Sequence, residues 1–236
     1  MCLTSFGLPK NKVGGIKLMD YVLIAFIAFI LSVIFSIGGV GSAIAIVPTM
    51  TWLGISLMVA KPTGLFINTL SMLSATLKNL REKKLDHRFG LPILIAATVS
   101  APIGAYTGKF VPKRYVLGGV FIAFLLYSGT MMIFFKPRPR GGKDGNHIVE
   151  GSMIGALAGF LGGLLGVGGG GGIISPTLIM LGYEPKKVAT TTALVVFFSS
   201  LSGFLTYWGG MGGTLDWKLL GVVSVSAIAG AGSERT

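Results

Sequence analysis

The stretch Gly151–Tyr183, GSMIGALAGFLGGLLGVGGGGGIISPTLIMLGY, contains no charged residue and no histidine. It is longer than the about 20 apolar residues that a helix needs to cross the hydrocarbon core of a bilayer. Its middle is the glycine run Gly166–Gly172, which is followed by Ile-Ile-Ser and then Pro176. The stretch therefore predicts a membrane-spanning segment whose helix is interrupted by glycine.

The rest of the chain has the same character. Only 12% of its 236 residues are Asp, Glu, Lys or Arg, and 52% are hydrophobic, whereas a soluble domain carries about 25% charged residues. A transmembrane β-barrel would alternate apolar and polar residues over segments of about ten, a pattern that Gly118–Phe135 lacks. We expect an all-α, polytopic transmembrane protein. Its helices are predicted at residues 20–53 (with a glycine break), 62–77, 89–108, 115–135, 148–181 (again broken), 188–208 and 219–231.

The second half of the chain resembles the first. Placing Pro48 on Pro176 aligns Gly38 with Gly166 and Gly41 with Gly169, and small gaps bring Leu85-Asp86 onto Leu215-Asp216. Repeated halves with glycine- and proline-interrupted helices are typical of secondary transporters, with the substrate site where the interruptions meet. The predicted organisation is a cytoplasmic tail (1–19), a first repeat (20–135), a cytoplasmic linker (136–147) and a second repeat (148–236) that is truncated because it lacks its final helix.

The net charge of +12 comes mainly from short connections between apolar segments. The basic residues concentrate in the N-terminal tail and at 78–88 and 136–147, as the positive-inside rule expects of cytoplasmic segments. We therefore expect a cell-membrane, multi-pass protein with its N-terminus inside, and no nucleic-acid binding. Counting each broken segment as one crossing makes the halves parallel, whereas treating Ala43–Leu53 as re-entrant makes them inverted.

The two glycine breaks are the candidate binding site. Glycines release the backbone from helical dihedrals, and the N–H groups of a helix that restarts after them attract an anion. Amide and hydroxyl side chains within the neighbouring spans are candidates to assist. The alternative is that the glycines only allow close helix packing and that the hydroxyls only join helices. The predicted substrate-binding residues are Gly38, Gly39, Gly41, Ser42, Asn68, Gly168, Gly169, Gly170, Gly171, Thr191 and Ser200.

Other charged residues have less specific interpretations. Asp86 and Asp216 precede predicted helices, where capping is a more common role than proton relay. Lys61 and the Glu184–Lys187 cluster follow the broken spans, where they attract anions or are simply solvated loop charges.

No enzyme chemistry is predicted. Residues 166–171 satisfy G-x-G-x-x-G, but they lie within a membrane span rather than between a strand and a helix. The sequence contains no Walker motif, and neither histidine has a metal-ligand partner at plausible spacing. We expect no cofactor and no metal.

The paired motifs resemble the sulfite exporter TauE/SafE family of membrane permeases. The matching pieces are Gly38–Pro48 with Leu53-Gly54, Gly166–Pro176 with Leu181-Gly182, and the two Leu-Asp pairs. The resemblance implies a permease that moves sulfite, organosulfonates or related small anions, exporting them by alternating access. Two alternatives stay open: a non-transporting or incomplete subunit that needs a partner, and a passive anion channel. The expected partners are a small anionic substrate and the lipid bilayer, and either a homo-oligomer or a partner subunit.

Overall fold

The computed structural model describes residues 26, 30, 41–81, 87–108, 110–112, 116–134, 147–168, 171–210 and 220–221. Every element in these residues is helical, which confirms the predicted all-α class. The predicted tail 1–19, linker 136–147 and last helix 219–231 lie wholly or almost wholly outside the described residues. The elements are α2 (Ala43–Trp52), α3 (Leu57–Arg81), α4 (His87–Thr107), the π-helix η1 (Val116–Phe121), α6 (Ile122–Phe134), α7 (His147–Leu165), α8 (Gly171–Met180) and α9 (Pro185–Gly210).

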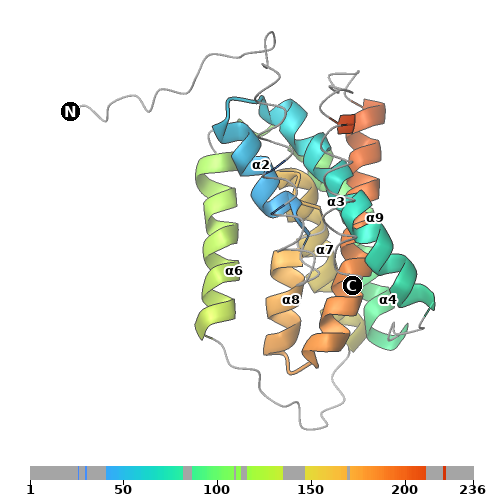
Figure 1. Cartoon of the computed structure of the whole chain (residues 1–236). Coiled ribbons are helices and arrows are strands. Elements are labelled where there is room, and N and C mark those ends of the chain that lie inside the picture. The colour runs from blue at the N-terminus through green and yellow to red at the C-terminus, as the bar shows by residue number, and fades with distance from the viewer. Residues whose placement is uncertain are drawn as a thin grey trace.

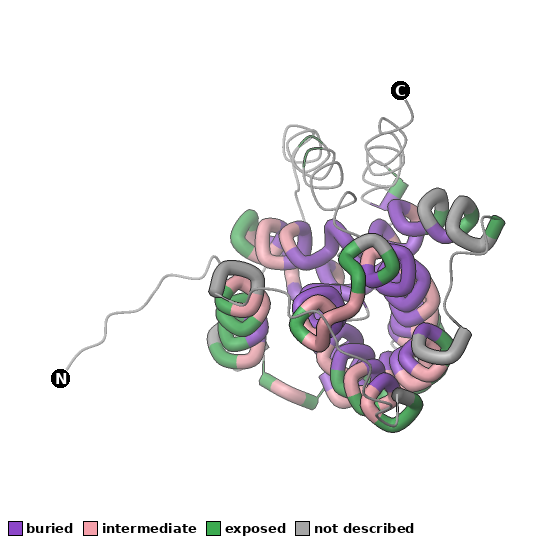
Figure 2. The backbone as a smooth tube through the Cα atoms, turned by 90° about the horizontal axis from the view of Figure 1, so that it is seen from below, coloured by how far each residue is buried: buried purple, intermediate pink, exposed green. Residues whose placement is uncertain are grey.

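Three of these helices are long and apolar enough to cross a membrane. The spanning segments are Gly90–Thr107 in α4, Ile148–Leu165 in α7 and Lys187–Gly209 in α9, and the other described helices contain shorter apolar stretches. Figure 2 shows the buried residues turned toward the middle of the bundle and the exposed ones on its outside. The outward side chains include large apolar ones such as Val99 and Met153, so the outer surface suits hydrocarbon.

Helices α4 and α7 pack against each other through glycine. A Cβ added to Gly155, Gly159 or Gly163 of α7 would overlap the backbone of Ile93, Ala97 or Ala101 of α4, respectively. The glycines and their α4 partners recur every four residues, the spacing that brings small residues onto one face of a membrane helix. We call Gly155, Gly159 and Gly163, with their α4 partners, the glycine seam; these three glycines precede the run Gly166–Gly172 and were not singled out from the sequence.

The first glycines of the run Gly166–Gly172 form a turn rather than a helix face. Helix α7 ends at Leu165, α8 begins at Gly171, and between them Gly166 and Gly168 have φ values of +78° and +68°. Side chains rarely adopt this left-handed region, because Cβ approaches the carbonyl oxygen. These two glycines therefore set the backbone of the turn between the helices.

Helices α2 and α8 match each other closely. Each is ten residues long with proline at its sixth position, and two residues beyond its end lies a glycine, Gly54 or Gly182, with φ of +88° or +87°. Figure 1 shows them end to end in the bundle, running in opposite directions from a common meeting point, with α6 alongside. The following helices, α3 and α9, also run antiparallel.

Candidate functional site

Asn68 lies in α3 at the point where the two halves of the chain meet. Its side chain is fully buried, and its Nδ2 donates hydrogen bonds to the carbonyl oxygen of Val167, at 3.3 Å, and to Ser200 Oγ in α9, at 3.0 Å. A single amide therefore joins α3 to the turn after α7 and to α9.

Glycines from both breaks approach this amide closely. Gly41, with φ of +89°, precedes α2, and a Cβ there would overlap Asn68 Oδ1. A Cβ on Gly168 would overlap Ser200 Oγ and approach Asn68 Nδ2 to 2.5 Å. Both positions therefore need glycine for two reasons, a left-handed backbone and the absence of room for a side chain. We refer to Gly41, Ser42, Asn68, Gly168 and Ser200 as the Asn68 cluster.

Two polar atoms of the cluster are unsatisfied. Within the described residues, Ser42 Oγ and Asn68 Oδ1 are buried and have no hydrogen-bond partner. Ser42 is the N-cap residue of α2, yet its side chain makes no capping hydrogen bond, although serine commonly does so at this position. The Asn68 amide is oriented by its neighbours, because the Val167 carbonyl only accepts and must face the NH₂ group. Oδ1 therefore faces Gly41 and can accept a hydrogen bond from a donor.

The N-terminal ends of α2 and α8 lie next to each other beside this cluster. A Cβ on Gly172, the second residue of α8, would lie 3.2 Å from Cδ1 of Ile44, the second residue of α2. The N–H groups of a first helical turn lack partners within the helix, and each N-terminus carries about half a positive charge. The site thus combines two positive helix ends with the hydroxyl of Ser42, which has no hydrogen-bond partner among the described residues.

The structure brings together five of the predicted site residues, those of the Asn68 cluster. Gly171 is the first residue of α8 and is buried. Thr191 is also buried, but the nine positions from Thr191 to Ser200 span about 13 Å of helix axis, so Thr191 lies well away from the cluster. Four predicted residues lie outside the described part of the chain: Gly38, Gly39, Gly169 and Gly170. Asp86 and Asp216 lie outside it as well.

The charged residues after the two breaks have different surroundings. Glu184 and Lys187 form an exposed ion pair at 3.6 Å, as expected of solvated charges. Lys61, by contrast, is only 4% exposed. The interpretation of Lys61 as a solvated loop charge is therefore wrong, because α3 begins four residues before it and carries it into the bundle.

Sequence reasoning also missed the hydrogen bond from Ser175 Oγ in α8 to Thr192 Oγ1 in α9, at 3.2 Å. Both residues are buried hydroxyls in apolar helices. A single sequence does not reveal which of many such hydroxyls face each other.

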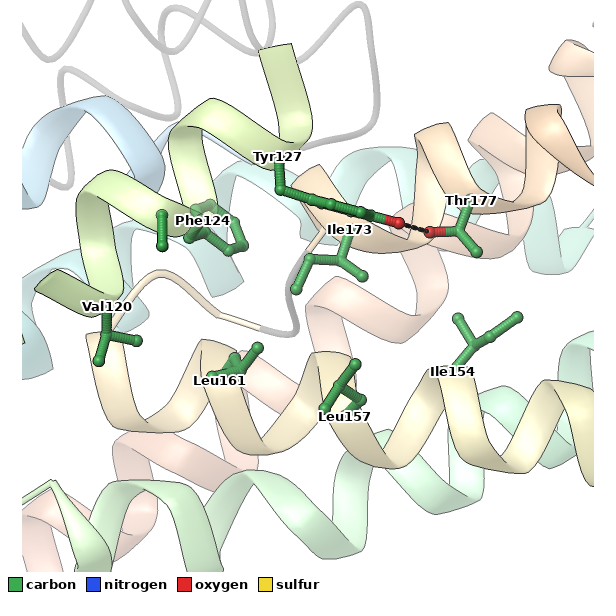
Figure 3. A pocket seen from close by; sticks show the side chains of 9 residues that line it. Val120, Phe124, Tyr127, Ile154, Leu157, Leu161, Ile173 and Thr177 are labelled. Carbon is green, nitrogen blue, oxygen red and sulfur yellow. Dashed lines mark hydrogen bonds between the residues drawn. The ribbon is translucent and has the colours of Figure 1, made fainter. Parts of the chain in front are cut away.

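A separate cavity of about 480 Å³ lies between α6, α7 and α8. Figure 3 shows the apolar side chains of Phe124, Leu157 and Leu161 around it, and Tyr127 extending across Ile173 to Thr177. The Tyr127 hydroxyl and Thr177 Oγ1 are 2.9 Å apart and hydrogen-bond each other. This lining suits hydrocarbon rather than an anion, because a ligand site for an ion needs convergent polar groups.

The comparisons with known proteins agree with this architecture. A family model described as "Sulfite exporter TauE/SafE" matches residues 24–232. The "Probable membrane transporter protein YunE" of Bacillus subtilis is 26% identical, over 84% of this chain and 81% of its own length. The "Probable membrane transporter protein YdhB" of the same organism is 26% identical, over 89% of this chain and 86% of its own length.

A plant relative matches a shorter part of the chain. The "Sulfite exporter TauE/SafE family protein 6" of Arabidopsis thaliana is 49% identical over 51 residues, 22% of this chain and 12% of that protein. No solved structure was found to match. Since the family model covers nearly the whole sequence and the described helices are apolar, the chain is a membrane protein that belongs to the sulfite exporter TauE/SafE family of transporters.

Proposed function

We propose that this protein exports sulfite, organosulfonates or related small anions, and that the anion binds at the Asn68 cluster. The observation that carries the proposal is the convergence of residues distant in sequence on a single buried amide. Gly41, Gly168 and Ser200 come from three different segments, and all approach Asn68. The names of the family and of its Arabidopsis member suggest sulfite as the substrate, and the electrostatics of the cluster favour an anion.

The unsatisfied atoms fit an oxyanion that retains one proton. The Ser42 hydroxyl and the N–H groups at the start of α2 can donate to anionic oxygens. Asn68 Oδ1 can accept a hydrogen bond from the O–H group that the same ligand retains. A hydrogen sulfite ion offers both kinds of oxygen, whereas a fully deprotonated oxyanion would place a negative oxygen beside Oδ1. A sulfonate that carries its own N–H donor, as an aminoalkanesulfonate does, would satisfy the same pair of atoms.

The proposed cycle is alternating access in a protein whose N-terminus lies in the cytoplasm. The opposite directions of α2 and α8 and of α3 and α9 favour the inverted relation between the halves 20–135 and 148–236, with Ala43–Leu53 re-entrant. Inverted repeats with broken helices at the substrate site are common in secondary transporters.

Replacing Asn68 with leucine is expected to reduce anion flux about 10- to 100-fold. The substitution keeps the branched shape of the side chain but removes the amide. Hydrogen bonds to a charged ligand contribute about 1.5–3 kcal/mol, with about 1.4 kcal/mol for each factor of ten. The measurement is efflux of labelled sulfite and of taurine from proteoliposomes, with membrane insertion and size-exclusion profiles checked in parallel.

Ser200→Ala should give a smaller loss of flux, because it removes one of two hydrogen bonds that orient Asn68. Ser202→Ala is the matched control, since Ser202 lies on the same helix but bonds to the carbonyl of Thr98 instead. Equal flux in the Asn68 variant and the wild type would contradict the proposed site. Non-saturable flux that follows the membrane voltage would indicate a passive channel, and flux only on co-expression with another chain would indicate an incomplete subunit.

A further inference from the structure

Lys61 is a buried cation without a counter-charge among the residues that the structure describes. It lies in the second turn of α3, which begins at Leu57, and is 4% exposed. Lys61 forms no ion pair with any residue that the structure describes, whereas Lys187, after the second break, pairs with Glu184 at the surface. Lysine is almost never fully buried unless it is paired.

The position of Lys61 is unfavourable on two counts. Burying most of a lysine side chain without a counter-charge weakens the hydration of its ammonium group, which is costly, and a positive charge near a helix N-terminus is disfavoured by the helix dipole. A purely structural side chain at this place could be leucine or methionine, which would fill the same space without either penalty. Ionisable residues inside membrane helices commonly mark the path of an ion or a substrate.

The side chain of Lys61 is held against the second glycine break. A Cβ on Gly166 would lie 2.6 Å from both Cβ and Cγ of Lys61, so the lysine stem packs directly on this glycine. Along the same side of α3, Gly64 lies beside the carbonyl oxygen of Gly166, and Asn68 bonds to the carbonyl oxygen of Val167. Lys61, Gly64 and Asn68 thus follow the turn 166–168 along one face of α3.

The seven positions from Lys61 to Asn68 span about 10 Å of helix axis. Between them, a Cβ on Gly64 would lie 2.5 Å from Cγ2 of Val47, so this face is tightly packed in the described conformation. Two polar side chains therefore lie on one face of one helix, separated by a packed glycine.

We infer that Lys61 is a second binding position for the transported anion, and that its ammonium group supplies the positive charge that balances the anion before or after it occupies the Asn68 cluster. This inference rests on the proposed function. It assigns the two positions different chemistry: Lys61 recognises net negative charge, whereas the Asn68 cluster recognises hydrogen-bonding geometry.

Lys61→Met removes the charge and keeps an unbranched side chain, and Lys61→Arg keeps the charge. We expect Lys61→Met to raise the KM for sulfite efflux at least 10-fold with a smaller change in kcat, and Lys61→Arg to retain most of the affinity. Lys187→Met is the matched control and should leave KM unchanged, because an exposed ion pair contributes little. A merely structural role for Lys61 would lower the amount of folded protein without changing KM, and an unchanged KM in Lys61→Met would overturn the inference.

A second measurement uses the unmodified protein and does not depend on the variant folding. An amine-reactive reagent, followed by peptide mass spectrometry, reports the labelling rate of Lys61 in the presence of sulfite, an amine-free alkanesulfonate or an uncharged sugar. Protection by either anion but not by the sugar is expected, with Lys187 unaffected. Equal labelling under all conditions would contradict the inference. If the wild-type protein carries no anion flux at all, the proposed function fails, whereas flux with an unchanged KM in Lys61→Met rejects only the role of Lys61.

Discussion

Replacing Gly168 with valine should abolish transport, reducing sulfite efflux more than about 100-fold. Two effects act together. The φ of +68° at Gly168 costs about 1–2 kcal/mol for a residue with a Cβ, and that Cβ would overlap Ser200 Oγ and crowd the Asn68 amide. The hydrogen bond between those two side chains, at 3.0 Å, cannot survive such an intrusion. Because about 1.4 kcal/mol corresponds to a factor of ten, a loss of this bond and of the site geometry gives the expected reduction.

The matched control for this prediction is Gly129→Val. Gly129 lies in α6 and has nothing within 4 Å of an added Cβ, so the same substitution meets neither strain nor collision. Proteoliposome efflux should therefore be close to that of the wild type. Wild-type flux in correctly inserted Gly168→Val protein would show that the anion does not bind at the Asn68 cluster.

Replacing Gly159 with leucine should have the largest effect on stability. Gly159 stands in the middle of the glycine seam, where an added Cβ would overlap the carbonyl oxygen of Ala97 and Ser100 Oγ. Backbone atoms cannot turn aside as a flexible side chain can, so α4 and α7 must move apart. We expect a loss of at least about 3 kcal/mol, the upper end for overpacked cores. At about 2–4 °C for each kcal/mol, the Tm should fall by about 6–12 °C.

Thermal unfolding of the detergent-purified protein, followed by intrinsic fluorescence or light scattering, provides the measurement. Gly209→Leu is the control, because an added Cβ at Gly209 in α9 meets nothing within 4 Å. Equal unfolding temperatures for the two variants would contradict the prediction that the glycine seam stabilises the protein.

The fold class could be predicted because bilayer thickness fixes the length of an apolar helix. The charge-free stretches 89–108 and 188–208 correspond to spanning segments of α4 and α9, with ends within a few residues. The end of α7 at Leu165 was harder to place, since Gly155–Gly172 is rich in glycine throughout. Which glycines pack on a neighbouring helix and which adopt a positive φ depends on contacts with Ile93, Ala97 and Ala101, and these are tertiary. The duplication itself stays a prediction, with the matched geometry of α2 and α8 in its favour.

The chemistry of the site was more accessible from sequence than its geometry. Asn68 was identified because a buried amide needs partners, and the partners that it has, Val167 and Ser200, are 99 and 132 positions away in sequence. Separations of this size leave no local pattern. The burial of Lys61 was not predicted for a related reason. A lysine four residues into a helix is exposed or buried according to which segment packs on it, and here the turn at Gly166 packs on Lys61.

The opposite directions of α2 and α8 have a consequence for how the site is closed. From their shared meeting point, α2 extends toward one end of the bundle and α8 toward the other (Figure 1). In the proposed alternating-access cycle, each short helix would act as a plug that closes the site toward one end of the bundle, with its positive end pointing inward in both cases. Displacing one plug would open a single half-channel and leave the other shut, so the anion would see the same favourable potential from either side. In such a protein the direction of net flux is set by the gradients and not by the site.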